Sequence, residues 1–136
     1  KKIMSNFQLP ISNKMSNDEC KKYDLEERTA RFGEAIIEFA KKIPQTPITI
    51  PLITQMVKAG TSVGANYCEA DCAESKRDFV HKIGICKKES KESKHWIRMI
   101  VKAVPELKDE AREHWREANE LTLIFSSIVN KSRKKG

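Results

Sequence analysis

Apolar residues recur at helical spacing in four stretches of the chain, and none of these stretches shows the strict alternation of a β-strand. Steps of three and four residues place such side chains on one stripe of an α-helix. The pattern therefore predicts an all-α fold, an up-down-up-down antiparallel four-helix bundle with one apolar seam per helix. The four seams are Leu25, Phe32, Ile36, Phe39 and Ile43; Leu52, Met56, Ala59, Val63, Tyr67 and Ala70; Phe79, Ile83, Cys86, Ser90, Ser93, Ile97, Ile100 and Val104; and Leu107, Ala111, His114, Ala118, Leu121, Phe125 and Ile128.

Capping residues and prolines set the expected boundaries of the helices. Asp24 is a suitable N-cap for the first helix, because its carboxylate can accept a backbone N–H. Ser75 followed by Asp78 has the capping-box spacing that starts the third helix. Pro51 fits the first turn of the second helix, and Pro105 separates the third from the fourth. The sequence therefore predicts a single bundle with short connections.

The formal net charge of +7 is unevenly distributed along the chain. Residues 1–23 carry +3 and are predicted to form a flexible basic arm, whereas residues 131–136 carry +4 and are predicted to form a basic tail. The bundle itself, residues 24–130, holds 17 basic and 17 acidic residues. Any attraction to polyanions is therefore expected to act partly through the two ends.

Two features of the second helix are unusual. From Ile48 to Cys68 the only charged residue is Lys58, and Gly60 and Gly64 lie in the helix interior. Glycine costs about 1 kcal/mol there relative to alanine, so these positions predict the close approach of other backbones. The helix is therefore expected either at the centre of the bundle or against a neighbouring subunit.

The second helix is not predicted to span a membrane, because polar residues interrupt any run of about 18 apolar residues. Four cysteines in a Lys-rich chain without the apolar segment of a signal peptide indicate a reducing environment. We therefore expect a cytoplasmic protein.

The third helix carries a second apolar strip besides its seam. Ile85, Trp96, Met99 and Ala103 project onto it, and Glu89 and Glu92 lie between them. A second strip indicates either a subunit interface or a third neighbour within one protomer. The two glutamates are interpreted as acceptors for Arg or Lys of a neighbouring subunit rather than as a catalytic carboxylate pair.

The third helix is also strongly basic, with nine Lys and Arg against three acids between residues 75 and 104, while the fourth has six acids against three bases. Part of this asymmetry is expected to be mutual neutralisation. Six bases nevertheless project onto an arc of about 80° beside the seam, which indicates either a nucleic-acid contact or a solvated face. The predicted nucleic-acid-binding residues are Lys76, Lys87, Lys91, Lys94, Arg98 and Lys102 of this stripe, with Lys131, Arg133, Lys134 and Lys135 of the tail.

Candidate catalytic and metal-binding residues are few. Cys68 and Cys72 could form a zinc site with His81 or Cys86, but the paired Cys-x-x-Cys spacing is absent, so we interpret them as small core or interface residues. His114 occupies a core position. The glycines of the second helix lack the Gly-Lys-Ser/Thr ending of a phosphate loop. We therefore expect no enzyme activity, no metal and no cofactor.

The segments Gln55–Ala70, Ser75–Phe79 and Lys88–Ile97 carry a family resemblance. They resemble the bacterial four helix bundle protein family, which includes proteins encoded in intervening sequences of 23S rRNA genes. The accessory variability determinant of diversity-generating retroelements is a more distant member. The similarity extends from about residue 24 to residue 128, and the motif Gly-Ala-Asn-Tyr-x-Glu-Ala is its most specific part.

The resemblance implies a homopentameric barrel without a catalytic site. In the retroelement branch it further implies a basic surface that binds RNA or cDNA and a reverse transcriptase partner; the alternative is an oligomer that acts through protein interaction only. Cysteines stand at positions 68, 72 and 86, where the family usually has a small residue. Asn66 and Glu69 match the family's Asn-x-x-Glu and are interpreted as fixing the second helix against a partner. The predicted oligomer interface is Gly60, Gly64, Asn66, Glu69, Ile85, Glu89, Glu92, Trp96 and Met99.

Overall fold

The computed structural model of the chain describes the backbone of residues 17–135 and the side chains of residues 25–134. Within this part of the chain there are four long α-helices, one short 3-10 helix and no strand. The predicted all-α four-helix fold is therefore confirmed. The elements are α2 (Asn17–Lys41), α3 (Thr49–Asp71), α4 (Lys76–Ala103), η1 (Pro105–Leu107) and α5 (Lys108–Lys135).

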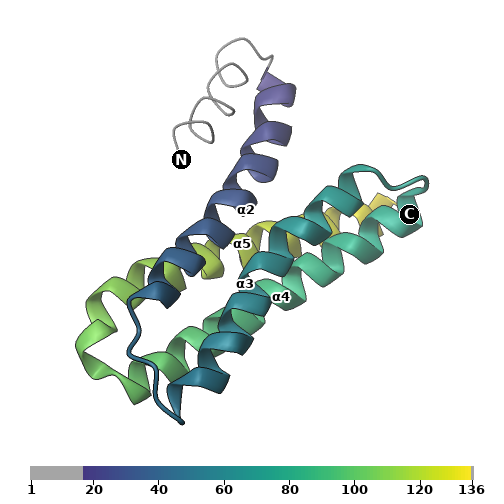
Figure 1. Cartoon of the computed structure of the whole chain (residues 1–136). Coiled ribbons are helices and arrows are strands. Elements are labelled where there is room, and N and C mark those ends of the chain that lie inside the picture. The colour runs from purple at the N-terminus through teal and green to yellow at the C-terminus, as the bar shows by residue number, and fades with distance from the viewer. Residues whose placement is uncertain (1–16, 136) are drawn as a thin grey trace.

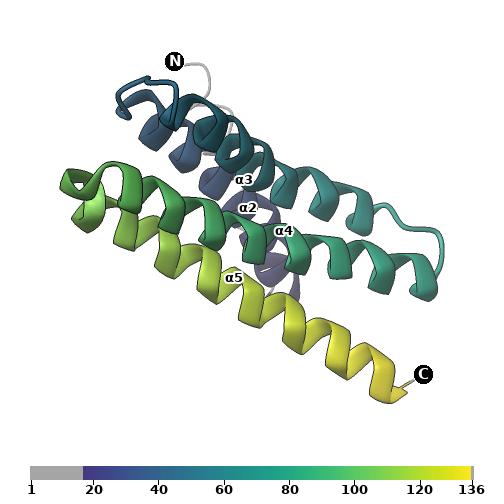
Figure 2. The same cartoon turned by 90° about the horizontal axis from the view of Figure 1, so that it is seen from below.

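Successive helices run in opposite directions, and α4 lies between α3 and α5 (Figures 1 and 2). Helix α2 lies opposite α4, where it contacts α3 extensively and α5 over a shorter stretch. The N-terminal turns of α2 project away from the other three helices (Figure 1). Both flanks of α4 are therefore occupied by neighbouring helices, and its remaining surface faces outward.

The four predicted seams meet in one core. Phe39, Met56 and Phe125 are almost completely buried. The ring of Tyr67 lies 6.4 Å from that of Phe125, which joins α3 to α5 across the bundle. In the seam of α4 every residue is buried except Phe79, which is half-buried. Burial of this apolar surface, at roughly 25 cal/mol per Å², is the main stabilising contribution to the fold.

Three of the predicted helix boundaries are confirmed. The Ser75 hydroxyl accepts the backbone N–H of Asp78 at 3.0 Å and so caps α4. Pro51 lies in the first turn of α3, and Pro105 opens η1 between α4 and α5. The connections at Ser75 and Pro105 are therefore short, and they hold α4 antiparallel to both of its neighbours.

The two ends of the bundle differ from the prediction. Helix α2 begins at Asn17, so Asp24 lies inside the helix and is not its N-cap. Helix α5 continues to Lys135, so the basic segment after residue 130 is helical rather than a separate tail. Lys and Arg are good helix formers, and their positive charge is favourable near a helix C-terminus. Most of the predicted N-terminal arm, residues 1–16, lies outside the described residues.

The glycines of α3 lie where α2 crosses it. A Cβ atom at Gly60 would lie 2.9 Å from Cγ1 of Ile36, and one at Gly64 would lie 3.3 Å from the carbonyl oxygen of Thr29. The predicted close approach is therefore real, but the approaching helix is α2 of the same chain. The assignment of Gly60 and Gly64 to an oligomer interface is corrected accordingly, since a second subunit is not needed to explain them.

We expect Gly60→Ala to destabilise the fold by about 1 kcal/mol. Overpacking against Ile36 costs about 1–3 kcal/mol, and the better helix propensity of alanine offsets about 1 kcal/mol of that. Gly84→Ala is the matched control, because a Cβ atom there meets no heavy atom within 4 Å. Gly84→Ala should stabilise the fold by up to about 1 kcal/mol. Urea unfolding measures the free energy of unfolding of both variants. Equal changes in the two variants would contradict the close contact between α2 and α3 at Gly60.

Candidate nucleic-acid interface

Three of the five acidic residues of α5 form ion pairs with Arg28 of α2 or with Lys42, the residue that follows this helix. The Arg28 guanidinium donates from Nε to Oε2 of Glu117 at 2.7 Å and from Nη2 to Oε1 of the same carboxylate at 2.9 Å. It also donates to Glu120 at 2.9 Å. These bonds raise the pKa of Arg28 above its ordinary value. About two turns towards the start of α5, the Lys42 ammonium donates to Glu110 at 2.7 Å. The acidic flank of α5 therefore faces α2.

The opposite flank of α5 is basic and faces α4. The ammonium of Lys94, on α4, donates to Oδ1 of Asn119 at 2.9 Å and lies 5.3 Å from the ring centroid of Trp115. At 100° per residue, Lys108, Arg112 and Arg116 project onto the same flank as these two residues. The expectation that acids of the fourth helix partly neutralise the stripe of the third is therefore wrong, since those with strong ion pairs lie on the side of α2.

The predicted stripe of α4 is present on the surface. Lys91, Arg98 and Lys102 are exposed, and Lys87 is half-buried. Within residues 25–134 none of these four side chains forms an ion pair with a carboxylate. We call the surface that α4 and α5 share the basic face. It consists of Lys87, Lys91, Lys94, Arg98 and Lys102 on α4 and of Lys108, Arg112 and Arg116 on α5.

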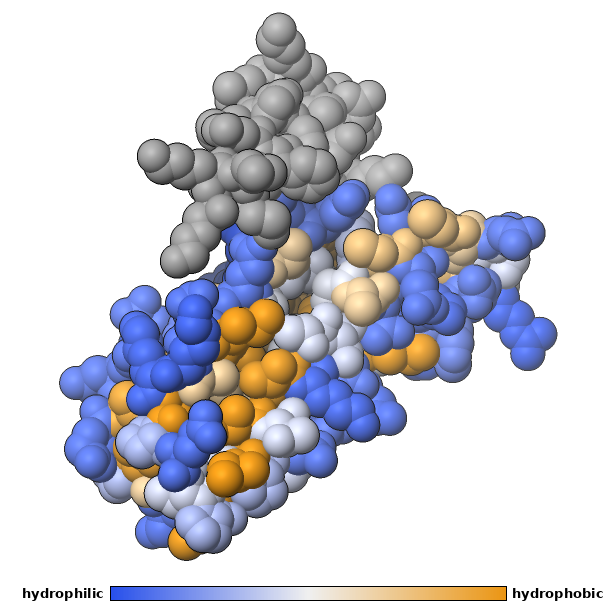
Figure 3. Space-filling model, viewed as in Figure 1, coloured by the Kyte–Doolittle hydropathy of each residue, from blue (hydrophilic) through white to orange (hydrophobic). Residues whose placement is uncertain are grey.

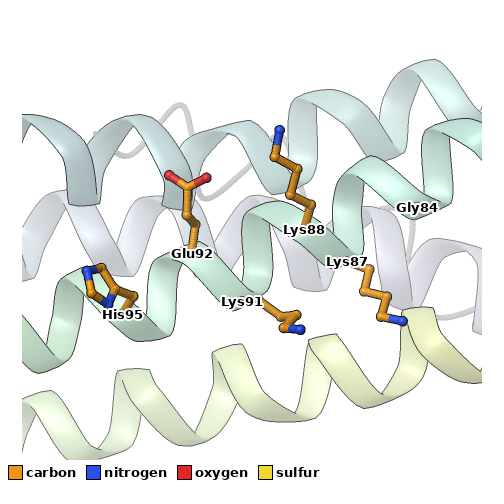
Figure 4. A pocket seen from close by; sticks show the side chains of 6 residues that line it. All are labelled: Gly84, Lys87, Lys88, Lys91, Glu92 and His95. Carbon is orange, nitrogen blue, oxygen red and sulfur yellow. The ribbon is translucent and has the colours of Figure 1, made fainter.

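A shallow hollow of about 500 Å³ lies on the outward surface of α4. Lys87 and Lys91 extend from it towards α5, whereas Lys88 and Glu92 extend towards α3 (Figure 4). Gly84 also lines the hollow and contributes no side chain. Three lysines against one glutamate give the lining of this hollow a net positive charge.

A second hollow, of about 410 Å³, lies between α4 and α5. Its apolar wall includes Val101 and Trp115, and its polar rim is cationic. One of these cations, Arg112, has a loose ion pair of 3.8 Å with Asp109, whose side chain is almost fully exposed. This hollow was not predicted from the sequence. Its cationic lining is Arg98, Lys108, Arg112 and Arg116.

The C-terminal turns of α5 add further cations at one end of the bundle. Lys131, Arg133 and Lys134 are exposed, whereas the side chain of Lys135 lies outside the described residues. Because α4 and α5 are antiparallel, this end of α5 lies at the end of the bundle where α4 begins with Lys76 (Figure 1). These residues therefore lengthen the positive surface along the bundle.

Asn66 and Glu69, predicted to fix α3 against a partner, have contacts within the chain. The Asn66 amide donates to the Ser62 carbonyl at 2.9 Å, one turn earlier in the same helix. The Glu69 carboxylate accepts from the Lys82 ammonium on α4 at 2.6 Å. Glu69 therefore fixes α3 against α4 of the same chain, which corrects the assignment of its partner.

The second apolar strip of α4 lies on the flank that faces α3. Ile85, Trp96 and Met99 are half-buried there, whereas Ala103 is exposed. The Trp96 indole donates to Glu92 at 3.3 Å, so Glu92 already has a partner in its own helix. Burial, with a smaller contribution from Glu92, raises the pKa of Glu89. Contacts within the protomer therefore already cover part of the strip. Its role in contacts between subunits stays a prediction.

Another apolar surface, which the sequence did not single out, lies over α2 and α3 (Figure 3). Ile37 and Ile50 are 41% and 49% exposed, and Ile53 and Val57 are half-buried beside the core. The signal was present in the sequence, because the charge-poor surface of the second helix extends beyond its seam. We call these four residues the apolar surface.

The described cysteines and His114 lie in different surroundings. Cys68 and Cys72 are exposed, and burial raises the pKa of the Cys86 thiol to about 12, which keeps it protonated. Among the described residues, no three His, Cys, Asp or Glu side chains gather where they could hold a metal ion. His114 is half-buried with its ring 4.9 Å from that of Phe39, and burial lowers its pKa.

None of the described helices combines the length and the apolar character that a membrane crossing needs. Even α3, the helix with the fewest charges, has Lys58 and several hydroxyl side chains on its surface. This agrees with the interruption of its apolar run in the sequence.

Comparison with known proteins places the chain in a family. A protein with unknown function from the S23 ribosomal protein family of Bacteroides thetaiotaomicron VPI-5482 has a solved structure that is similar with a TM-score of 0.74. It is 24% identical, and the match covers 81% of this chain and 98% of that chain, which shows the shared fold. No curated protein has a matching sequence. Residues 21–127 match the family described as 23S rRNA-intervening sequence protein, and the chain therefore belongs to that family.

Proposed function

We propose that this protein is a non-enzymatic, oligomeric scaffold that binds nucleic acid through its basic face. The observation that carries the proposal is the separation of charge on α5. Arg28 and Lys42 pair with Glu110, Glu117 and Glu120 on one flank, so the other flank adds cations to those of α4 instead of neutralising them. A surface of one sign attracts polyanions, and a phosphate backbone releases counterions when it binds there.

The shape of the basic face suits an extended ligand. The two hollows follow one another along α4, from Gly84 to His95 and from Ile97 to Val101. A linear polyanion could contact Lys87 and Lys91 at the first hollow and Arg98 at the second without changing its direction. A small anion would use only one of these groups. The length of the face therefore favours a nucleic acid over a small phosphorylated metabolite.

Self-association is part of the proposal. The apolar surface on α2 and α3 lies away from the basic face, so subunits could associate there and still leave the cations open. The family resemblance implies a pentameric ring, in which rotational symmetry would repeat the basic face. Its retroelement branch further suggests a reverse transcriptase partner, which a neighbouring reverse transcriptase gene would support. An oligomer that acts through protein contacts only is the alternative.

We expect the double variant Lys91→Glu/Arg98→Glu to bind a single-stranded RNA roughly tenfold or more weakly than the wild type at low salt. The slope of log K against log salt should become shallower by about 0.7 for each phosphate contact that is lost. Lys41→Glu/Lys58→Glu is the matched control, because it changes the net charge equally on exposed positions away from the basic face. Fluorescence anisotropy over a salt series measures both. Equal affinities of the two variants would contradict the assigned surface, and a flat curve for the wild type would favour the alternative.

For self-association, Ile50→Glu should reduce the molar mass in sedimentation equilibrium to that of a single chain. A carboxylate at this 49% exposed position stays solvated in the protomer but would be buried between subunits, which is costly. Leu123→Glu, at a 61% exposed apolar position of α5, should keep the mass of the wild type. If Ile50→Glu also keeps that mass, the apolar surface is not the interface.

A further inference from the structure

Trp115 is an aromatic residue that the core does not use. It is 39% exposed, whereas the rings of Phe39 and Phe125 on the seams are almost completely buried. A large apolar ring left in water gains little unless something covers it. Trp115 lies in the wall of the hollow between α4 and α5, so a ligand that enters this hollow would meet the indole.

The position of the Trp115 ring is supported from α4. The Lys94 ammonium lies 5.3 Å from the ring centroid, within reach of a cation–π interaction. The same ammonium donates to Asn119, one turn after Trp115, at 2.9 Å. Lys94 is therefore fixed at two points and in turn orients the indole. A ring oriented before binding loses less conformational entropy when a ligand covers it.

The cations around the ring are arranged as a phosphate-binding rim. Arg98 reaches the hollow from α4, and Arg112 and Arg116 reach it from α5. Guanidinium groups bind phosphate oxygens in bidentate geometry, which a lysine cannot do. A volume of about 410 Å³ lies within the range of roughly 300–1,000 Å³ that small-molecule sites occupy. One nucleotide unit therefore suits both the space and the chemistry of the hollow.

From these contacts we infer that the hollow between α4 and α5 binds an unpaired nucleotide, whose base stacks on Trp115 while its flanking phosphates contact the surrounding arginines. The inference rests on the proposed function and deepens it, because it assigns single-stranded RNA or DNA as the preferred ligand. A duplex keeps its bases stacked inside and presents only phosphates to the basic face. Base–aromatic stacking is tolerant of sequence, so no particular base is required.

Fluorescence of Trp115 tests the inference directly. In Trp96→Phe, Trp115 is the remaining tryptophan of the chain, because the sequence holds two. A single-stranded oligouridylate should quench its emission at saturation. A duplex RNA of equal length and an inorganic polyphosphate should bind without comparable quenching, since neither offers an unpaired base. Quenching by all three ligands, or by none of them while they bind, would overturn the stacking.

Affinity measurements give a second, independent readout. Trp115→Ala should weaken binding of the oligouridylate about 5- to 150-fold, the range that loss of one base–aromatic stack produces. Trp115→Phe should retain most of the affinity, and neither variant should change the affinity for the duplex. Equal weakening for single strand and duplex would show a general loss of structure or charge and would overturn the inference.

A test without any substitution covers the case in which a variant does not fold. A 4-thiouridine oligonucleotide, cross-linked to the wild-type protein by light, should label the peptide that contains Trp115. Cross-links confined to other peptides would overturn the inference and leave the proposed function intact. If the wild type binds neither single strand nor duplex at low salt, the proposed function fails as well.

Discussion

The contact between α2 and α3 at the two interior glycines is the constraint on which the arrangement of charge depends. Because Gly60 and Gly64 have no side chains, Ile36 and the backbone at Thr29 come directly against α3. This places α2 beside α5, where the Arg28 guanidinium donates hydrogen bonds to two glutamates of α5. A Cβ atom at Gly60 would press on the Ile36 side chain, and one at Gly64 would require the backbone at Thr29 to shift, so the position of α2 depends on both glycines.

The consequence appears on the far side of α5. Three glutamates of α5 are paired on the side of α2, and the flank that faces α4 carries only Lys, Arg and uncharged side chains apart from the exposed Asp109. Cations brought together in this way repel one another, and salt or a bound polyanion relieves that repulsion. A surface of this kind is tolerated in a protein of marginal stability when the rest of the fold offsets it. Here the burial of four apolar seams and the ion pairs between α2 and α5 supply that offset.

Periodicity in the sequence predicted the four helices, their seams and the cap at Ser75, because each of these depends on residues close together in the chain. The basic stripe of α4 was likewise predictable from one helix alone. The hollow around Trp115 was not predicted from the sequence, since its cations come from two helices and residues 108–120 of α5 hold five acids against three bases. A helical-wheel projection of α5 places its acidic and basic residues on different flanks, but only the structure shows which neighbouring helix faces each flank. The same limit explains why the close approach at Gly60 was predicted while its partner, α2, was not.

The central claim is that the nucleic acid lies across α4 and α5 and not on the opposite side of the bundle. Lysine acetylation of the native protein with and without a bound single-stranded RNA, read by mass spectrometry, tests this most directly. The account predicts that RNA protects Lys87, Lys91 and Lys108 and leaves Lys41 and Lys58, exposed on α2 and α3, as reactive as before. Protection of Lys41 and Lys58, or equal protection of all five lysines, would contradict it.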